Sequence, residues 1–196
     1  MRRAEIEELG YIVPIDTVAS ILERGILSHR RAENLEHLSI ALQDVQDRRA
    51  NVTVPNGGAL HAYANLYICP RNPMLFKRRN IHAEICVLRL RVEVLDIPNV
   101  VITDSNAASK YVGFRPAPSG LEIVNRERTF ARRWTHDDQI EQWRHAAQMC
   151  AEVLVPNLVP PGYVFGAYVS CAQAERRLRE VAPTLDITVN ADLFFQ

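Results

Sequence analysis

Apolar residues recur at helical spacing in two segments near the start of the chain. Residues 15–27 carry one apolar stripe, with Asp16 or Thr17 able to cap a helix and Gly25 able to end it. Residues 32–50 carry a second stripe that ends in the adjacent pair Arg48 and Arg49. The apolar positions are Val18, Ile21, Leu22 and Ile26 in the first segment and Leu35, Leu38, Leu42 and Val45 in the second. The pattern predicts a helix in each segment.

The pattern changes to that of extended chain in the middle of the sequence. After the turn VPNGG at 54–58, residues 61–70 predict a strand or extended segment that Pro70 and Pro73 bring to an end. Residues 84–97 alternate apolar with charged side chains, which predicts a half-buried strand. Residues 100–104, VVITD, predict a further strand.

The remainder of the chain mixes both patterns. Residues 105–125 are rich in Ser, Gly, Pro and Asn, which predicts a long surface excursion. A helix is expected to begin after a cap near Asp137, and the chain becomes β-branched at Val153. Residues 164–182 predict a strand and then a helix capped by Ser170, and residues 186–195 predict a last strand.

No internal repeat, low-complexity tract or linker divides these elements. The simplest organisation is a single domain over residues 1–196, of the α+β class.

Composition limits the range of function. Of the 196 residues 47% are hydrophobic, enough for a substantial core, and the 23 basic residues balance the 23 acidic ones. No stretch of about 18 uninterrupted apolar residues occurs, so we expect a soluble, cytoplasmic protein with no membrane partner. Nearly all the basic residues are arginines, which suits bidentate recognition of phosphate but fits a biased composition equally well.

The four cysteines are widely spaced and no histidine lies at the spacing of zinc ligands. We therefore expect buried thiols, no disulfide framework and no metal. They are Cys69, Cys86, Cys150 and Cys171.

The common nucleotide and hydrolase motifs do not occur. Gly57 and Gly58 fit neither GxGxxG nor GxxxxGK[ST], and no GxSxG is present. Asp137 and Asp138 could be a pair of acids for glycoside hydrolysis, but they fit a helix cap better.

Two segments remain as candidates for chemistry. Residues 43–76 join two arginines at a helix end to a turn, a tyrosine-bearing strand and PRNPML. The second is CAEVLVP, with Glu152 just inside a strand. From the residues alone, this carboxylate is either solvated on a half-exposed strand face or held for chemistry.

Three sequence blocks resemble the DarT-type DNA ADP-ribosyltransferases, the toxins of a toxin–antitoxin system. They are GYIVPIDTVASILERGIL, DRRANVTVPNGGALHAYANLYICPRNPMLF and AEVLVPNLVPP, and their order and spacing match across residues 10–169. The middle block is the most specific, because helix, RR, VP, GG, LHAY, a tyrosine strand and PRNPML occur in one order.

The resemblance implies an ADP-ribosyltransferase-like fold, with central mixed or antiparallel sheets around an NAD cleft and flanking helices. It also implies NAD as co-substrate, transfer of ADP-ribose to a base of single-stranded DNA, a monomer, and a partner antitoxin with a macrodomain. Arg49 and Glu152 fall on the family's catalytic arginine and glutamate, and Met74 on a residue of the NAD pocket. The cofactor-binding set that follows is Tyr11, Ile12, Val13, Gly25, Arg49, Tyr67 and Met74. The predicted nucleic-acid-binding set is Arg48, Arg71, Arg78, Arg79 and Asn106. The arginines near the proposed site could hold the phosphates of a single strand or form a solvated charge run, and Asn106 could read a base edge.

The chain departs from the family pattern at four positions. Tyr11, Pro14 and Thr17 stand where the first family block has two histidines and an asparagine, and Asn106 replaces a histidine after the central TD. Transfer to RNA is therefore an alternative within the enzyme class. A catalytically idle nucleic-acid-binding module is the alternative from another class, which the intact Arg49 and Glu152 oppose.

Overall fold

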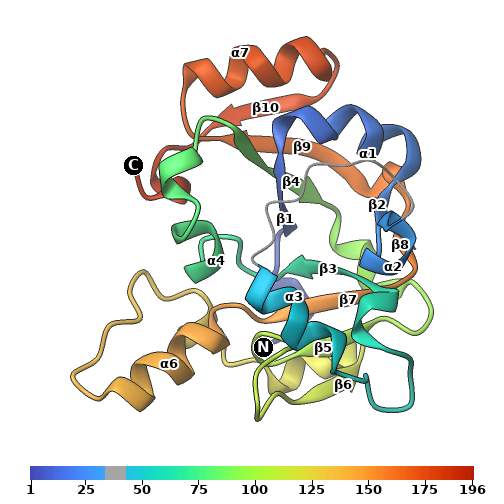
Figure 1. Ribbon diagram of the computed structural model, residues 1–196, viewed down its shortest axis with the longest axis vertical. Coiled ribbons are helices and arrows are strands. Elements are labelled where there is room, and N and C mark those ends of the chain that lie inside the picture. The colour runs from blue at the N-terminus through green and yellow to red at the C-terminus, as the bar shows by residue number, and fades with distance from the viewer. Residues whose placement is uncertain (34–42) are drawn as a thin grey trace.

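A computed structural model describes residues 1–33 and 43–196, and within them most strands belong to one mixed sheet (Figure 1). The sheet has the order β10-β9-β4-β1-β3-β7-β5-β6, and a separate pair is formed by β2 and β8. Among the strand pairs of the described residues, only β10 with β9 is parallel. The strands are β1 Leu9–Pro14, β2 Ile26–Leu27, β3 Tyr63–Tyr67, β4 Ile85–Leu90, β5 Val101–Thr103, β6 Phe114–Pro116, β7 Glu152–Pro156, β8 Leu158–Val159, β9 Val164–Val169 and β10 Asp186–Val189.

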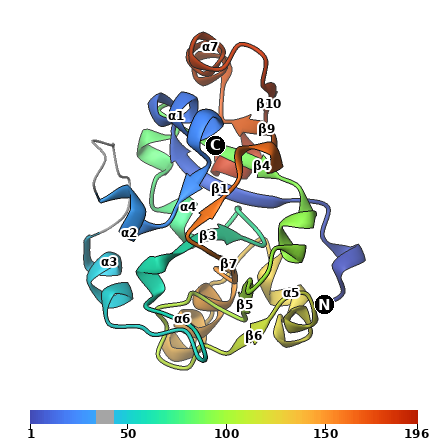
Figure 2. The same cartoon turned by 90° about the vertical axis from the view of Figure 1, so that its right-hand side faces the viewer.

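Short helices surround the sheet. Turned by 90°, the molecule has α7 at the top, α5 and α6 at the bottom, and α2 and α3 on one side (Figure 2). The α-helices are α1 Val18–Arg24, α2 His29–Ala32, α3 Gln43–Ala50, α4 Pro73–Phe76, α5 Arg126–Thr129, α6 Gln139–Gln148 and α7 Ala172–Val181. The 3-10 helices are η1 Arg3–Glu5, η2 Ile15–Thr17, η3 Leu60–Ala62, η4 Arg79–Ile81, η5 Val92–Asp96, η6 Ser119–Ile123, η7 Pro161–Tyr163 and η8 Asp192–Phe194. The predicted α+β class is confirmed.

The large sheet is weakly joined at its centre. Strands β1 and β3 pair at one position, Gly10 with Tyr67, whereas β1 and β4 pair along all of β1. Gly10 is required here, because a Cβ atom on it would lie 2.7 Å from Cβ of Pro70. The strands on either side of this position diverge, so Tyr67 lies where the two halves of the sheet part.

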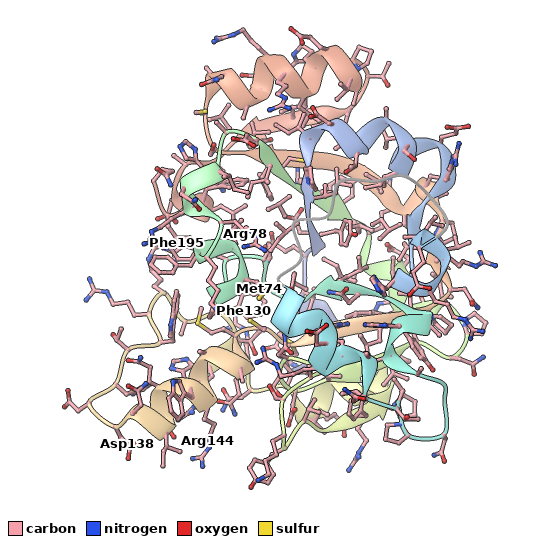
Figure 3. All side chains as sticks on the ribbon, viewed as in Figure 1. Met74, Arg78, Phe130, Asp138, Arg144 and Phe195 are labelled. Carbon is pink, nitrogen blue, oxygen red and sulfur yellow. The ribbon has the colours of Figure 1, made fainter. Side chains whose placement is uncertain are left out.

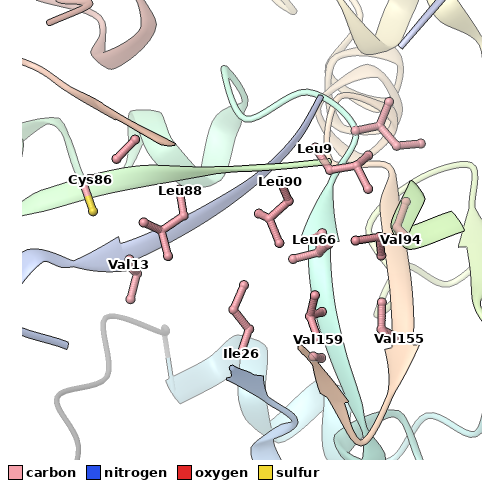
Figure 4. Packing of buried hydrophobic residues seen from close by; sticks show 14 of the residues in the cluster. Leu9, Val13, Ile26, Leu66, Cys86, Leu88, Leu90, Val94, Val155 and Val159 are labelled. Atoms are coloured by element: carbon pink, nitrogen blue, oxygen red, sulfur yellow. The ribbon is translucent and has the colours of Figure 1, made fainter. Parts of the chain in front are cut away.

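The main core covers one face of the sheet and draws on both of its halves. Figure 4 shows Leu9, Val13 and Leu88 from one half packed in the same cluster as Leu66 and Val155 from the other. Apolar burial of this kind supplies most of the free energy of folding, at about 25 cal/mol per Å². One core therefore spans both halves of the sheet, although β1 and β3 hardly pair.

The predicted half-buried strand at 84–97 is wrong in two respects. Ile85 and Val87 pack in a separate cluster with Phe194, while Cys86 and Leu88 face the main core, so β4 is buried on both faces. The C-terminal η8 covers the second face, a long-range contact that an alternating pattern does not reveal. Beyond Arg91 the chain leaves the sheet and forms η5.

The first predicted helix is confirmed as α1, but it is shorter than predicted. Gly25 ends it, as expected, and Ile26 and Leu27 form β2. Thr17 occupies the N-cap position, as one of the two predictions had it, but it makes no side-chain capping bond, because its hydroxyl donates to the carbonyl of Pro14 at 2.9 Å. Asp16 instead accepts two hydrogen bonds from Arg177 of α7.

The second predicted helix is confirmed where it is described. Its end is α3, which carries Arg48 and Arg49 in its last turn. The predicted positions Leu35, Leu38 and Leu42 lie outside the described residues.

The segment 105–125 is more structured than the predicted surface excursion. It contains β6 and η6, and Ala107, Leu121 and Val124 are buried. Its Gly and Pro residues serve turns between packed elements, which composition alone does not distinguish from an open loop.

The C-terminal half follows the prediction with small changes. Helix α6 is capped by Asp138, whose carboxylate accepts from the N–H groups of Ile140 and Glu141. Cys171 rather than Ser170 is the N-cap residue of α7, because the Ser170 hydroxyl donates to the carbonyl of His82. The last strand ends at Val189 and η8 follows. No described helix is long and apolar enough to cross a membrane.

Candidate active site

A buried ion pair joins α3 to β7. Nη1 of Arg49 lies 3.1 and 3.0 Å from the two carboxylate oxygens of Glu152. Arg49 is 5% exposed and Glu152 is 0% exposed. Removing one partner of such a pair typically costs about 3 to 5 kcal/mol, because the other charge stays buried without compensation. The predicted catalytic residues are thus brought together across 103 positions of sequence.

The segment that follows β5 fixes the Glu152 side chain and main chain. Oε1 of Glu152 accepts a hydrogen bond from the backbone N–H of Ala107 at 3.0 Å. Its own backbone N–H donates to Oγ1 of Thr103 at 3.0 Å, and the Thr103 hydroxyl donates to the carbonyl of Ser105 at 2.6 Å. The carboxylate is therefore held in place by a cation and by a main-chain donor.

The burial of Glu152 follows from which face of β7 it occupies. Val153 and Val155 point into the main core, whereas Leu154 packs on the other face with Ala107. Side chains alternate along a strand, so Glu152 shares the face of Leu154. The sequence left open that Glu152 lies on a half-exposed strand face. In the structure this face is covered, because α3 and the segment after β5 lie over it.

Tyr67 lies directly opposite Glu152 on the neighbouring strand β3. It is 7% exposed, and burial, with the Glu152 carboxylate as the next cause, raises its pKa well above the ordinary value. The phenol therefore stays protonated at neutral pH and can donate a hydrogen bond. Arg78 lies close enough for its charge to act on the Tyr67 phenol, and burial lowers the pKa of Arg78.

Met74 lies in α4, whose start is fixed by Asn72. The Asn72 side-chain oxygen accepts from the backbone N–H groups of Met74 and Leu75 at 2.9 and 3.1 Å, and Pro73 occupies the first turn. Cys150, two residues before Glu152, lies close to the backbone of Met74, and burial raises its pKa to about 12. Figure 3 shows Met74 on α4 with Arg78 nearby. The contact between Cys150 and the backbone of Met74 places PRNPML close to the start of β7.

The other predicted cofactor residues are more dispersed. Tyr11 is half-buried and packs against the main core, and Val13 is buried within that core. Ile12 points to the other face of the sheet and packs against the cluster that contains Phe194 of η8. Gly25 has φ 87°, and a Cβ atom on it would lie 2.3 Å from the carbonyl oxygen of Val159. Its identity is explained by the end of α1 without any ligand.

The predicted nucleic-acid residues have structural contacts as well. Arg71 donates to the main-chain oxygens of Asp192 and Arg132 and lies over the ring of Phe195. Arg79 lies 4.2 Å from the ring centroid of Phe76.

Asn106 and Arg48 complete that set. The Asn106 side-chain oxygen accepts from the N–H of Ala108 at 3.0 Å, so it shapes the turn that presents Ala107 to Glu152. Arg48 is exposed at the end of α3. Their roles toward nucleic acid stay predictions.

Sequence reasoning missed Thr103 and Ala107, which hold Glu152. Ala107 acts through its backbone N–H, and because almost every residue has such a group, the residue type does not indicate this role. Thr103 ends the VVITD strand, and a hydroxyl at the end of an otherwise apolar strand is the one local hint.

The chain matches the family described as ssDNA thymidine ADP-ribosyltransferase, DarT, over residues 11–195. It is 31% identical over 201 residues to a DNA ADP-ribosyl transferase–DNA ADP-ribosyl glycohydrolase fusion protein of Thermosipho africanus (strain H17ap60334), covering 96% of this chain and 49% of the relative. The chain therefore spans about half the length of that fusion protein. A DNA ADP-ribosyl transferase of Thermus aquaticus (strain ATCC BAA-2747 / Y51MC23) is 30% identical over 165 residues, covering 76% of this chain and 69% of the relative.

Solved structures show the same fold. Thermosipho africanus DarTG in complex with ADP-ribose superposes with a TM-score of 0.85 at 26% identity, covering 96% of this chain and 51% of that one. Thermus sp. 2.9 DarT in complex with ADP-ribosylated ssDNA superposes with a TM-score of 0.83 at 23% identity, covering 96% of both chains, a likeness of fold. The predicted ADP-ribosyltransferase fold is confirmed, and the chain belongs to the DarT family.

Proposed function

We propose that this chain is a mono-ADP-ribosyltransferase that moves ADP-ribose from NAD onto a base of single-stranded DNA. The observation that carries the proposal is the buried Arg49–Glu152 pair with Tyr67 opposite it. A buried carboxylate with a fixed cation and a main-chain donor, at the point where the sheet divides, serves chemistry better than it serves stability.

Glu152 acts on the ribose of NAD. The bond from the nicotinamide nitrogen to C1′ breaks and its electron pair leaves with nicotinamide, so C1′ and the ring oxygen share a positive charge. A carboxylate next to C1′ stabilises this charge. Glu152 has no exposed surface, so a neighbouring group has to move before the ribose reaches it, and we propose that the Arg49 guanidinium turns from the carboxylate toward the NAD pyrophosphate. The oxocarbenium then replaces the guanidinium as the partner of the carboxylate.

Arg49 then holds the pyrophosphate of NAD. Both of its contacts to Glu152 use Nη1, so the guanidinium has further N–H donors with which to bind phosphate oxygens. Tyr67 and Met74 flank the nicotinamide ribose, and Tyr11 closes the set from β1. Val13 is buried in the main core and Gly25 is bounded by Val159, so both would contribute through their main chain.

The acceptor is a ring nitrogen of the base. In thymidine N1 already carries the sugar, so N3 is the ring nitrogen that bears a removable proton. N3 attacks C1′, a new N-glycosidic bond forms, and the proton passes to Glu152 and then to water. The family description names thymidine, and this base is the acceptor we propose here.

The four departures from the family pattern fall near β1 and β5. The Thr17 hydroxyl donates to the Pro14 carbonyl, so two of the replaced positions support each other. Asn106 shapes the turn at Ala107. Arg49 and Glu152 themselves are unchanged, so we propose that these replacements alter how NAD and the acceptor are read, and RNA is the second acceptor to test.

A toxin that modifies DNA needs an activity that reverses the modification. We propose a partner antitoxin with a macrodomain, as suits a relative named as a fusion with a DNA ADP-ribosyl glycohydrolase. We further propose that residues 1–196 act as a single domain and a monomer, in the cytoplasm.

The test is transfer of label from NAD to short single-stranded DNA and RNA oligonucleotides that each lack one base. The parent is compared with Glu152→Gln, which keeps the side-chain volume, and with Glu122→Gln, which changes an exposed glutamate. Loss of general-base and electrostatic help should lower transfer by about two to four orders of magnitude in Glu152→Gln. Glu122→Gln should match the parent.

Each outcome decides between the candidates. Label on every DNA except the one without thymine supports the proposal, and label on RNA alone moves the acceptor. An intact NAD pool with no label on either nucleic acid contradicts an enzyme and supports the idle binding module. Equal transfer by Glu152→Gln and the parent would remove Glu152 from the chemistry.

A further inference from the structure

Two histidines and a glutamate that belong to none of the predicted sites come together at the end of α2. One side-chain donor atom from each of His29, Glu33 and His61 lies within 4.8 Å of the others. His29 and His61 are half-buried and Glu33 is exposed. The cluster is formed by residues on two separate elements, so it exists only in the folded chain.

The local structure explains how the three side chains meet. His29 begins α2 and Glu33 lies four positions later, just past its end, so both project from one side of the turn. His29 Nε2 lies 3.5 Å from Oε1 of Glu33. His61 lies in η3, and its ring centroid is 4.2 Å from that of His29.

Main-chain hydrogen bonds fix the position of His61. The N–H of Leu60 donates to the carbonyl of Val52 at 2.8 Å, and the N–H of Asn157 donates to the carbonyl of Ala62 at 2.8 Å. The N–H of Ser28, next to His29, donates to the carbonyl of Asn157 at 2.8 Å. Asn157 thus ties the main chain next to His29 to the main chain next to His61, so the backbone positions of the two histidines are fixed relative to each other.

The donor set matches a class of metal ion. Two imidazoles and one carboxylate bind Zn²⁺ in many proteins, with water in a fourth position, whereas Mg²⁺ and Ca²⁺ prefer oxygen donors. Ligand bonds of about 2.0 to 2.2 Å place tetrahedral donors about 3.4 Å apart. The distance of 3.5 Å between His29 Nε2 and Glu33 Oε1 already fits this value. The other donor atoms lie up to 4.8 Å apart, and the exposed Glu33 carboxylate has room to move closer to them.

We propose that His29, Glu33 and His61 bind a divalent transition-metal ion of the Zn²⁺ type. The ion would link α2 to η3, which leads directly into β3 and Tyr67. Because the N–H of Val52 donates to the carbonyl of Arg49, the same η3 is also connected to the end of α3. The metal would therefore fix the elements that carry Arg49 and Tyr67, and it takes no part in the transfer step.

The experiment uses the full chain, stripped with a chelator and free of NAD and DNA. Co²⁺ replaces Zn²⁺ in imidazole–carboxylate sites and gives a visible absorption band that reports its geometry. We expect one Co²⁺ to bind per chain and Zn²⁺ to abolish the band. Zn²⁺ at a hundredfold excess over its Kd should raise the Tm by about 5 to 10 °C.

Three variants locate the ion. Glu33→Gln changes an exposed side chain and should leave the fold intact, and His29→Gln and His61→Gln remove the imidazoles. Loss of a group that only hydrogen-bonds to a metal ligand weakens metal binding by about 10- to 100-fold. Each of these variants removes a ligand itself, so each should weaken metal binding by more than that. His136→Gln, which changes an exposed histidine of a different pair, should bind metal like the parent.

The proposal is overturned by a stripped protein that shows neither the band nor the Tm shift. It is equally overturned if Glu33→Gln and His29→Gln keep the parent's band or if His136→Gln loses it. A missing band and Tm shift would mean that the cluster is only a His–Glu surface pair. Either of the two variant results would mean that the ion binds elsewhere.

Discussion

The Arg49 guanidinium contacts Glu152 through the single nitrogen Nη1, which lies within 3.1 Å of both carboxylate oxygens. This is not the two-nitrogen fork in which arginine usually meets a carboxylate. A lysine ammonium could also make a single-nitrogen contact, but its three donors lie on one atom and cannot present the planar pair of N–H groups that fits a phosphate. The geometry therefore separates the structural role of Arg49 from its proposed role in NAD binding.

Arg49→Lys and Arg49→Ala should separate these two roles. Arg49→Ala leaves the Glu152 charge buried without its partner, so the free energy of unfolding should fall by about 3 to 5 kcal/mol. Arg49→Lys should lose less stability, yet its rate of NAD consumption should fall at least about tenfold, because lysine cannot bind the pyrophosphate through a planar pair of N–H donors. Chemical denaturation and NAD turnover measure the two effects, and a fully active Arg49→Lys would limit Arg49 to the ion pair.

Gly25→Ala should destabilise the fold. The residue has φ 87°, and the added Cβ atom would lie 2.3 Å from the Val159 carbonyl oxygen. We expect the free energy of unfolding to fall by about 1 to 3 kcal/mol. Gly58→Ala is the matched control, because a Cβ atom there meets nothing within 4 Å. If Gly25→Ala is as stable as Gly58→Ala but binds NAD poorly, Gly25 has a direct role in the cofactor site.

The thiols should differ in reactivity. The backbone N–H of Ala174 lowers the pKa of Cys171 at the start of α7, and this thiol is partly exposed. Burial raises the pKa of Cys69 to about 11 and that of Cys150 to about 12. Because thiolate is the reactive form, iodoacetamide at neutral pH should modify Cys171 first. Peptide mass mapping over time checks the order, and early labelling of Cys150 would contradict its burial next to Glu152.

Stability should fall on the acid side of neutrality because of His145. Burial lowers the pKa of His145 below 6.5, its ordinary value, while the unfolded chain keeps that value. The unfolded state then binds more protons, so the contribution of His145 is complete above pH 6.5 and is lost as pH falls through the folded pKa. Thermal melts from pH 7.5 to 5 should show a steeper loss in the parent than in His145→Gln.

The hydrogen bonds of His145 define the neutral form of its ring. Its Nε2 lies 3.2 Å from the carbonyl of Arg128, which can only accept, so the proton of the neutral ring is assigned to Nε2. Its Nδ1 then accepts from Nε2 of His136 at 2.8 Å. A second proton would place charge next to Arg128 and His136. Equal pH slopes for the two proteins would show that the pair tolerates this charge.

Local sequence patterns predicted those helices and strands whose formation depends on nearby residues. Helix α1 follows from its apolar stripe and ends at the glycine that the pattern indicated, and Asp138 caps α6 one residue from the expected position. Strands β5, β7 and β9 follow from short apolar runs. Strand β4 was assigned one buried face because the contact with Phe194, more than a hundred positions away, leaves no mark in its alternation.

The order of residues in DRR, PRNPML and AEVLVP by itself determined the family and the pair Arg49 and Glu152. Tertiary structure decided their environment: β7 turns Glu152 away from the main core, α3 places Arg49 over it, and Ala107 adds a backbone donor. It also decided that His29, Glu33 and His61 meet. The physical reason is that burial, ion pairing and ligand geometry depend on distances between residues far apart in sequence, which folding alone brings within hydrogen-bonding range.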